Sequence, residues 1–236
     1  MATEKNRIVL VGNEKGGVGK TTVAFNLAVM RVKQGRNVIL VDTDKQGSSA
    51  MWASLRAEED HNQPPLLCVQ KYGKVGADLL ALQKVYEVIV DAGGQDSVEL
   101  RQSIAVADQW IIPVRPGQLD LVAMTKMRQL RRDVFNRVGQ APATSVLLNA
   151  VSAATKEGEE ARALLNEEND ELGEEEGGRM IVMDSMMIDR VSVRRAMRFG
   201  CAVVELPSKE SSNAALTEIG AVYKEVFGEA YEPDQE

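Results

Sequence analysis

The sequence predicts an α/β fold, a single domain in which a mostly parallel, twisted sheet is flanked by helices on both faces. Short runs of apolar, often β-branched residues recur along the 236-residue chain and alternate with segments of helical periodicity, a pattern typical of parallel strands buried on both faces. The first run leads through a glycine-rich turn into a helical segment. No internal repeat and no Pro/Ser-rich linker divides residues 1–236, so we expect one domain.

Each expected element follows from its own local pattern. Strands are predicted where apolar residues follow one another, and helices where apolar residues return every three or four positions. The strands are expected at 8–11, 38–41, 66–69, 88–90, 110–114, 146–148 and 180–183. The helices are expected at 20–34, 47–59, 75–84, 95–107, 118–137, 157–171, 190–199 and 209–228.

Composition narrows the class of protein. Hydrophobic residues make up 44% of the chain and aromatic residues 4%, so we expect a sizeable core of aliphatic side chains and methionine. The two cysteines, Cys68 and Cys201, are far apart and form no CxxC pair. They indicate a reducing compartment and argue against an iron–sulfur or zinc cluster. No apolar stretch is long enough for a signal peptide or a membrane span, so a soluble, cytoplasmic protein is expected.

The negative charge is concentrated in one segment. Between Lys156 and Glu176 there are ten acidic and two basic residues, a balance of −8 in a chain of net charge −7. The rest of the chain is therefore close to +1 and can present a basic face. For the segment 156–178 we expect a solvated acidic helix that ends in a Gly-Gly turn, with partner binding as the alternative. A second acidic stretch, 229–236, forms the tail.

The strongest functional signal is the run from Lys15 to Thr22, Lys-Gly-Gly-Val-Gly-Lys-Thr-Thr. A strand, a glycine-rich turn and a helix that opens on Gly-Lys-Thr form the phosphate-binding arrangement of P-loop nucleotide hydrolases. The turn directs backbone N–H groups into one concavity, Lys20 adds a charge for the β- and γ-phosphates, Thr21 suits a bridging Mg²⁺ ion, and Thr22 suits the α-phosphate. The predicted nucleotide-binding residues are Gly16, Gly17, Val18, Gly19, Lys20, Thr21 and Thr22.

The loop departs from the usual spacing at its start. Glu14 stands where a glycine is expected, and Lys15 follows it. Lys15 is either a solvated loop residue or a second cation directed at phosphate, in which case it would serve the nucleotide of another subunit. The run resembles the ParA/MinD group of deviant Walker-A ATPases, and it matches their motif at Lys15, Gly16, Gly17, Gly19, Lys20 and Thr21. The resemblance implies that Lys15 crosses an ATP-sandwich homodimer to the partner's phosphates.

Two further stretches extend the resemblance. Residues 38–47 resemble the family's second motif, which implies that Asp44 orients the attacking water and that Asp42 lies near the metal; Asp42 is also suited to cap the next helix. Lys45 stands where the family has proline. Residues 87–91 resemble the Walker-B strand, which implies that Asp91 holds Mg²⁺ through water, and 92–94 form a turn suited to sensing the γ-phosphate.

Weaker likeness continues through 111–120, 147–149, 189–191 and 202–205, so the resemblance covers most of the chain. Asn149, at the end of a predicted strand, is either a contact for the nucleotide base or a turn residue. The run 91–97 resembles the small plasmid-partition ParA proteins more than the large ones.

A group of arginines suggests a surface for DNA. Arg190, Arg194 and Arg198 follow helical i, i+4, i+8 spacing, with Arg195 beside them. A solvated helix face is the plain interpretation, whereas the resemblance implies nonspecific DNA binding by the ATP dimer through these residues. A further set on the 118–137 helix either extends that face or is solvated. Its members are Arg128, Arg131 and Arg132.

The sequence therefore favours an ATP- and Mg²⁺-dependent dimerising ATPase with weak turnover that a partner protein stimulates. Such a protein binds DNA as the ATP dimer, associates with the nucleoid, and segregates or positions a plasmid, a chromosome region or a protein microcompartment. The predicted catalytic residues are Lys15, Lys20 and Asp44, acting by positioning and charge neutralisation. The alternatives are a nucleotide-gated scaffold and a MinD-like membrane-surface ATPase. The acidic, proline-containing tail disfavours the membrane.

Overall fold

A computed structural model describes residues 5–58, 64–118, 121–172, 180–207, 209–210 and 212–232. It contains one seven-stranded sheet in the order β3-β2-β4-β1-β5-β6-β7. Every strand pair in it is parallel. The strands are β1 (Ile8–Val11), β2 (Val38–Asp42), β3 (Leu67–Gln70), β4 (Glu87–Asp91), β5 (Gln109–Val114), β6 (Ala143–Val151) and β7 (Ile181–Ile188).

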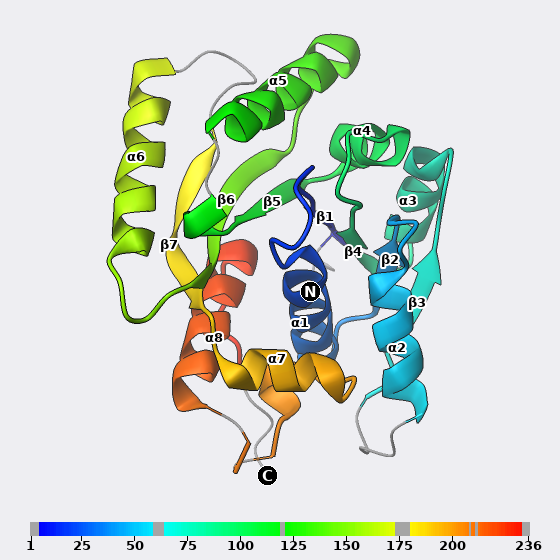
Figure 1. The fold of residues 1–236 in the computed structure, drawn as a ribbon. Coiled ribbons are helices and arrows are strands. Elements are labelled where there is room, and N and C mark those ends of the chain that lie inside the picture. The colour runs from blue at the N-terminus through cyan, green and yellow to red at the C-terminus, as the bar shows by residue number, and fades with distance from the viewer. Residues whose placement is uncertain are drawn as a thin grey trace.

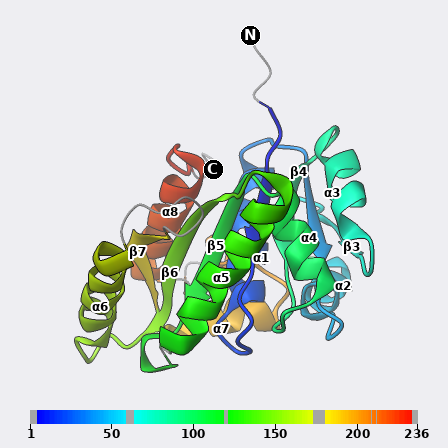
Figure 2. The ribbon, with the colours of Figure 1, turned by 90° about the horizontal axis from the view of Figure 1, so that it is seen from above.

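Helices cover both faces of this sheet (Figures 1 and 2). One layer consists of α1 (Lys20–Lys33), α2 (Ser48–Glu58), α7 (Val191–Arg198) and α8 (Asn213–Phe227). The other consists of α3 (Val75–Gln83), α4 (Val98–Val106), α5 (Leu121–Val138) and α6 (Glu157–Leu172). Two short 3-10 turns, Pro116–Gln118 and Val203–Glu205, complete the described elements. The predicted fold class is confirmed.

The two core clusters follow from strand geometry. Successive side chains of a strand point to opposite faces, so Val9 and Val11 belong to the core cluster on the side of α1 and α8, while Ile8 and Leu10 belong to the cluster on the side of α4 and α5. Both sets are fully buried. A sheet covered on both faces therefore requires an uninterrupted apolar run, which is what made these strands predictable.

Strands β6 and β7 are much longer than predicted. Strand β6 begins at Ala143 and β7 extends to Ile188, because polar residues such as Thr144 and Ser145 take part in the ladder and break the apolar run by which we expected them. Helices α4 and α8 begin three and four residues later than expected, because Ser97 caps α4 by accepting from the Leu100 amide at 3.0 Å and Ser212 caps α8.

The prediction for Arg128 is wrong in both of its forms. The Arg128 side chain is buried between α5 and α6, 2.6 Å from a carboxylate oxygen of Glu168. Arg131 donates to the Thr144 hydroxyl at 2.9 Å and to the Pro142 carbonyl. Arg128 is therefore neither solvated nor part of an exposed basic face. Arg131 is half-buried, and its contacts attach α5 to the start of β6. Arg132 is half-buried.

The acidic segment forms a helix, as predicted, but one side of it is not solvated. Ala161 and Leu165 of α6 are buried in the core, and Glu168 pairs with Arg128; residues 173–178, with the expected Gly-Gly turn, lie outside the described part of the chain. In the tail, Glu229 pairs with the buried Arg31 of α1, and 233–236 are not described. None of the described helices is long and apolar enough to cross a membrane.

Candidate functional site

The predicted phosphate loop lies at the carboxyl ends of the central strands, where ligands bind in open parallel sheets. It borders a cavity of about 610 Å³. The cavity is lined by the glycine loop, the start of α1, the segment after β2 and the turn after β4, with Met197 added from α7. The structure thus brings together the loop, Asp44 and the turn at Gly93 and Gly94, as the sequence predicts.

The loop is held in shape by its own side chains. Gly19 is the N-cap of α1, so Lys20 and Thr21 lie in the first helical turn, where free N–H groups attract anions. The Lys20 ammonium donates to the Lys15 carbonyl at 2.9 Å and so spans the loop. Asn13 accepts from the Lys15 amide at 3.0 Å and donates to the Pro113 carbonyl at 2.8 Å. Lys15 itself is half-buried at the head of the loop.

Lys20 is in an unusual environment for a lysine. It is only 8% exposed, and burial lowers the pKa of its ammonium, an effect that the charges of Asp91 and Asp44 oppose. An ammonium that has already lost most of its water gives up little hydration when it contacts phosphate. This arrangement suits the predicted role of Lys20 on the β- and γ-phosphates.

The predicted metal corner is assembled around Asp91. The hydroxyls of Thr21 and Ser49 each donate to Asp91 Oδ2 at 2.7 Å. The other oxygen, Oδ1, is buried and has no hydrogen-bond partner. Burial raises the pKa of the Asp91 carboxyl to about 7, with the charge of Asp42 adding to the shift and the two hydroxyls opposing it.

These residues fit a magnesium ion. Thr21 uses its proton on Asp91 and keeps its oxygen lone pairs for a cation, and Asp91 Oδ1 is available for a metal-bound water. The described residues include no cluster of three or more His, Cys, Asp or Glu side chains arranged to hold a metal by themselves. Magnesium needs no such cluster when phosphate oxygens supply further ligands.

The segment after β2 attaches Asp44 to this corner. Asp42 accepts from the amides of Asp44 and Ala50 at 2.9 and 3.0 Å, so it caps α2 as one of the two interpretations expected. Asp44 accepts from the Gln46 amide at 2.9 Å, and the Gly47 amide bonds to the Asp44 carbonyl. Lys45 therefore occupies the family's proline position without opening the turn.

The turn after β4 faces both Asp44 and the loop. A Cβ atom placed on Gly93 would lie 3.3 Å from Asp44 Cγ, and one on Gly94 would lie 3.3 Å from Lys20 Nζ. A side chain at either position would require Asp44 or Lys20 to shift by a few tenths of an ångström. A γ-phosphate near Lys20 would therefore be close to residues 93–94.

Asn149 lies inside β6 rather than at a turn. It is 6% exposed, and its amide nitrogen donates to the Val18 carbonyl in the loop at 2.7 Å. The structure thus brings Asn149 to the loop. Its contact with a nucleotide base remains a prediction.

Three of the four predicted arginines lie on α7, and Arg190 lies just before it. Arg190 precedes α7 and bonds to Glu218 of α8 at 3.0 Å, and Arg194 pairs with Asp189. Arg195 and Arg198 are exposed on α7. The Met197 sulfur, also on α7, lies 4.0 Å from the Thr22 hydroxyl, so α7 contacts the start of α1.

Sequence reasoning missed Ser49, Asn13 and Met197. Asn13 directly follows the first strand and Ser49 follows the Asp42 motif, so position alone offered a weak signal. Met197 reaches the cavity from a helix 175 residues further along the chain than Thr22, and only the fold reveals its place.

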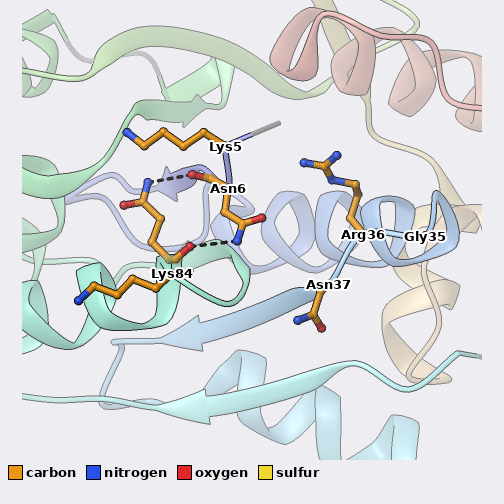
Figure 3. Close-up of a pocket in the computed structure, with 7 residues that line it drawn as sticks. Lys5, Asn6, Gly35, Arg36, Asn37 and Lys84 are labelled. Carbon is orange, nitrogen blue, oxygen red and sulfur yellow. Dashed lines mark hydrogen bonds between the residues drawn. The ribbon is translucent and has the colours of Figure 1, made fainter. Parts of the chain in front are cut away.

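A second cavity, of about 640 Å³, lies at the opposite ends of the strands, beside the residues that precede β1, β2 and β4 (Figure 3). Lys5, Arg36 and Lys84 line it, and Asn6 and Gln83 bond to each other across it. Helices α1 and α3 both end here, and basic side chains commonly accompany the negative ends of helix dipoles. Its basic lining therefore has a structural cause, and no predicted site residue lies there.

Comparison with known proteins agrees with the geometry of the loop cavity. Residues 9–203 match the family described as the CobQ/CobB/MinD/ParA nucleotide binding domain. Protein ParA of Rhizobium radiobacter is 26% identical over 220 residues, 89% of this chain and 91% of that protein. The maintenance of carboxysome distribution protein A of Gloeobacter kilaueensis is 38% identical over 125 residues. That match covers 50% of this chain and 53% of the relative, so the chain spans about half of its length.

Solved structures share the fold across nearly the whole chain. A variant of Cyanothece McdA in complex with ATP superposes with a TM-score of 0.70 at 15% identity, covering 98% of this chain and 100% of that one. MinD of Pyrococcus horikoshii with Mg-ADP gives 0.66 at 15% identity, with 94% and 96% covered. The fold is that of the ParA/MinD ATPases, and the chain belongs to the CobQ/CobB/MinD/ParA family of nucleotide-binding domains.

Proposed function

We propose that this protein is an ATPase that dimerises on ATP, binds DNA nonspecifically as the dimer, and uses that cycle to segregate or position a cargo. The observation that carries the proposal is the corner of Thr21, Asp91 and Ser49 beside Lys20 and Asp44. It supplies a cationic loop for phosphate, an unpartnered carboxylate oxygen for a hydrated cation, and a second carboxylate for water. Those three features suit phosphoryl transfer to water.

In this proposal some residues of the site bind the phosphate chain and others position the attacking water. The loop amides and Lys20 bind and orient the phosphate chain, and Asp44 orients the attacking water in line with the γ-phosphate. Mg²⁺, held through Thr21 and Asp91 when bound, neutralises the charge of the β- and γ-phosphates. Catalysis in this proposal rests on positioning and charge neutralisation rather than on a covalent intermediate. The slow intrinsic turnover and its stimulation by a partner protein are proposed from the likeness to the ParA/MinD ATPases.

The dimer is proposed from Lys15. Lys20 already spans the loop of its own subunit, so a second lysine at the loop head is suited to the phosphates of a facing subunit. A Lys15→Ala variant should bind ATP but fail to dimerise and turn over. If dimerisation persists in that variant, the proposed role of Lys15 in the other subunit is wrong.

The DNA surface is proposed from Arg195 and Arg198, together with the more constrained Arg194 and Arg190. A dimer doubles these charges, so retention on DNA should require ATP and fall steeply with salt. The decisive experiment is retention of nonspecific duplex DNA with ATP and Mg²⁺ or with ADP, with dimerisation followed in parallel by light scattering. Equal retention in both nucleotides, or none at moderate salt, contradicts the DNA-binding part of the proposal.

A nucleotide-gated scaffold is the second candidate, and the Asp44 geometry makes it testable. If an Asp44→Ala protein loses turnover yet still positions its cargo, hydrolysis serves only as a reset. A MinD-like membrane-surface role is the third candidate, and it would require a basic amphipathic helix that binds an anionic membrane.

The cargo class is proposed from the relatives' names alone, which concern carboxysome distribution and partition. The stimulating partner is proposed to present a basic tail to the acidic face of α6 and the residues that follow it. Deleting 157–176 without effect on partner-stimulated turnover would contradict that docking site.

A further inference from the structure

Strand β6 is irregular at the point where it passes the phosphate loop. Between the pairs Leu148–Met186 and Val151–Ile188 it has one residue more than β7, which is a β-bulge. Ala150, inside this bulge, has φ 52° and is the one non-glycine residue with positive φ in the described part of the chain. A left-handed alanine is uncommon and costs free energy relative to a regular strand conformation.

The bulge has a clear consequence for its neighbour Asn149. Bulges next to active sites often redirect a side chain, and here the Asn149 amide points at the loop and donates to the Val18 carbonyl at 2.7 Å. The fit is close: a Cβ atom on Gly19 would lie 2.1 Å from Asn149 Nδ2, and Gly19 has φ 90°. Any side chain at position 19 would displace Asn149 from the loop.

Peptide geometry transmits this contact to the anion-binding side of the loop. The described chain contains no cis peptide bond, and in a trans peptide the C=O and the following N–H point in opposite directions. Because Asn149 binds the Val18 carbonyl on the buried side, the Gly19 N–H is directed away from it. Gly19 lines the cavity, and Asn149 does not. The contact therefore fixes which way one of the loop amides faces.

We propose that Asn149 is a positioning residue for the phosphate chain of the nucleotide, acting through the Val18–Gly19 peptide. The strained bulge at Ala150 is retained because it directs Asn149 to that peptide. The ligand that Asn149 serves is thus the polyphosphate part of the nucleotide, and the base contributes nothing to its effect. The inference rests on nucleotide binding at this loop, as proposed above.

The test compares ligands that share phosphates but differ in the base. Affinities for ATP, GTP and inorganic tripolyphosphate are measured on wild type, Asn149→Ala and Asn149→Asp; aspartate keeps the shape but lacks the N–H donor. Both variants should lose affinity for all three ligands by a similar factor, about tenfold for the loss of one oriented amide and its buried partner. A loss for ATP with unchanged tripolyphosphate binding would assign Asn149 to the base and overturn the proposal.

A second measurement needs no ligand. In the nucleotide-free protein, hydrogen exchange at the Val23 amide, which donates to the Gly19 carbonyl at 3.0 Å and so reports on how firmly the loop is held, should quicken in both variants, while exchange in β1 and β4 stays at the wild-type rate. Ala150→Gly is the matched control, since it keeps Asn149 and removes only the strain, and its binding should stay within about twofold of wild type. Unchanged exchange at the Val23 amide in both variants would also overturn the proposal.

Failure of the proposed function and failure of the role of Asn149 give different results. If wild type binds neither ATP nor tripolyphosphate, the proposed function is wrong. If wild type binds both and the Asn149 variants bind them equally well, only the inference about Asn149 is wrong.

Discussion

Thr21 donates its hydroxyl proton to Asp91 Oδ2 at 2.7 Å, joining the first turn of α1 to the last residue of β4. Ser49 of α2 donates to the same oxygen at the same distance. The helices that follow β1 and β2 therefore meet at one carboxylate, which is fully buried. Both the stability of the protein and its affinity for Mg²⁺ should depend on this carboxylate.

Replacing Asp91 by asparagine should stabilise the protein in the absence of Mg²⁺ while abolishing Mg²⁺-dependent nucleotide binding. Burial raises the pKa of this carboxyl from 3.8 to about 7, so the folded state binds its proton more tightly than the unfolded state. Wild type therefore loses stability as the pH rises from about 4 to 7, by up to about 4 kcal/mol, and the variant does not.

Thermal unfolding in EDTA across this pH range measures the effect. The variant's advantage in Tm should grow from pH 4 to 7 and level off above, reaching several degrees for a chain of this size. Identical midpoints at pH 8 would show that the carboxylate carries no such cost.

A Ser49→Ala variant should need more Mg²⁺ to bind ATP. Without this hydroxyl, Asp91 Oδ2 keeps one donor and the carboxylate is less firmly oriented, and loss of such a supporting contact weakens metal sites by about tenfold. Mg²⁺ titration of fluorescent ATP binding measures the change. Ser103→Ala is the matched control, because the Ser103 hydroxyl is also buried but has no hydrogen-bond partner. An equal shift in both variants would indicate general loosening of the fold.

Local sequence predicted the fold and the loop, because continuous apolar runs and the Gly-Lys-Thr turn are properties of consecutive residues. Contacts between distant residues were not predictable. The position of Ser49 after the Asp42 motif does not identify Asp91 as its partner. Arg128 has the pattern of a solvated arginine, although it pairs with Glu168 in the interior. The spacing of Arg190 and Arg194 predicts a shared helix face. In the structure α7 begins at Val191, one residue after Arg190, and the Arg190 side chain donates to Glu218.

Reversing the charge of Arg195 and Arg198 together should abolish ATP-dependent retention on DNA and leave ATP affinity unchanged. Both side chains are exposed on α7, and removing phosphate contacts weakens binding for all sequences and lowers its salt dependence. The control is Lys5→Glu with Lys84→Glu, which makes the same change in net charge at the second cavity, at the amino ends of the strands (Figure 3). Filter binding at two salt concentrations should separate the pairs; equal losses would point to net charge rather than to α7.

Cys68 should react slowly with thiol reagents in the native protein. Burial raises the pKa of its thiol to about 12, with the charges of Asp42 and Asp91 adding to the shift, and only the thiolate is nucleophilic. At pH 8 the rate should therefore lie about three orders of magnitude below that of an unperturbed cysteine. A Cys201→Ala protein isolates Cys68, and the same protein in guanidinium gives the reference rate. Native and denatured rates within tenfold of each other would contradict the prediction.

Arg31→Met should destabilise the fold without weakening nucleotide binding. The Arg31 guanidinium donates to both carboxylate oxygens of Glu87, at 2.6 and 2.7 Å, and the two side chains are 4% and 1% exposed. Removing Arg31 leaves the Glu87 carboxylate buried with the more distant Arg36, 3.4 Å away, as its remaining ion-pair partner among the described residues. Breaking one side of a buried pair costs about 3–5 kcal/mol.

Urea unfolding of Arg31→Met, Glu87→Gln and the double variant measures the coupling between the two residues. The double variant should recover part of the loss, because it leaves no buried unpaired charge. Arg101→Met is the surface control: its pair with Asp96 is 41% and 40% exposed, so its effect should stay below about 1 kcal/mol. Glu87 begins β4 and Asp91 ends it, so the Arg31–Glu87 pair and the metal corner lie at opposite ends of this strand. ATP affinity should therefore be unchanged in every folded variant, and additive losses in the double variant would show that the pair is not coupled.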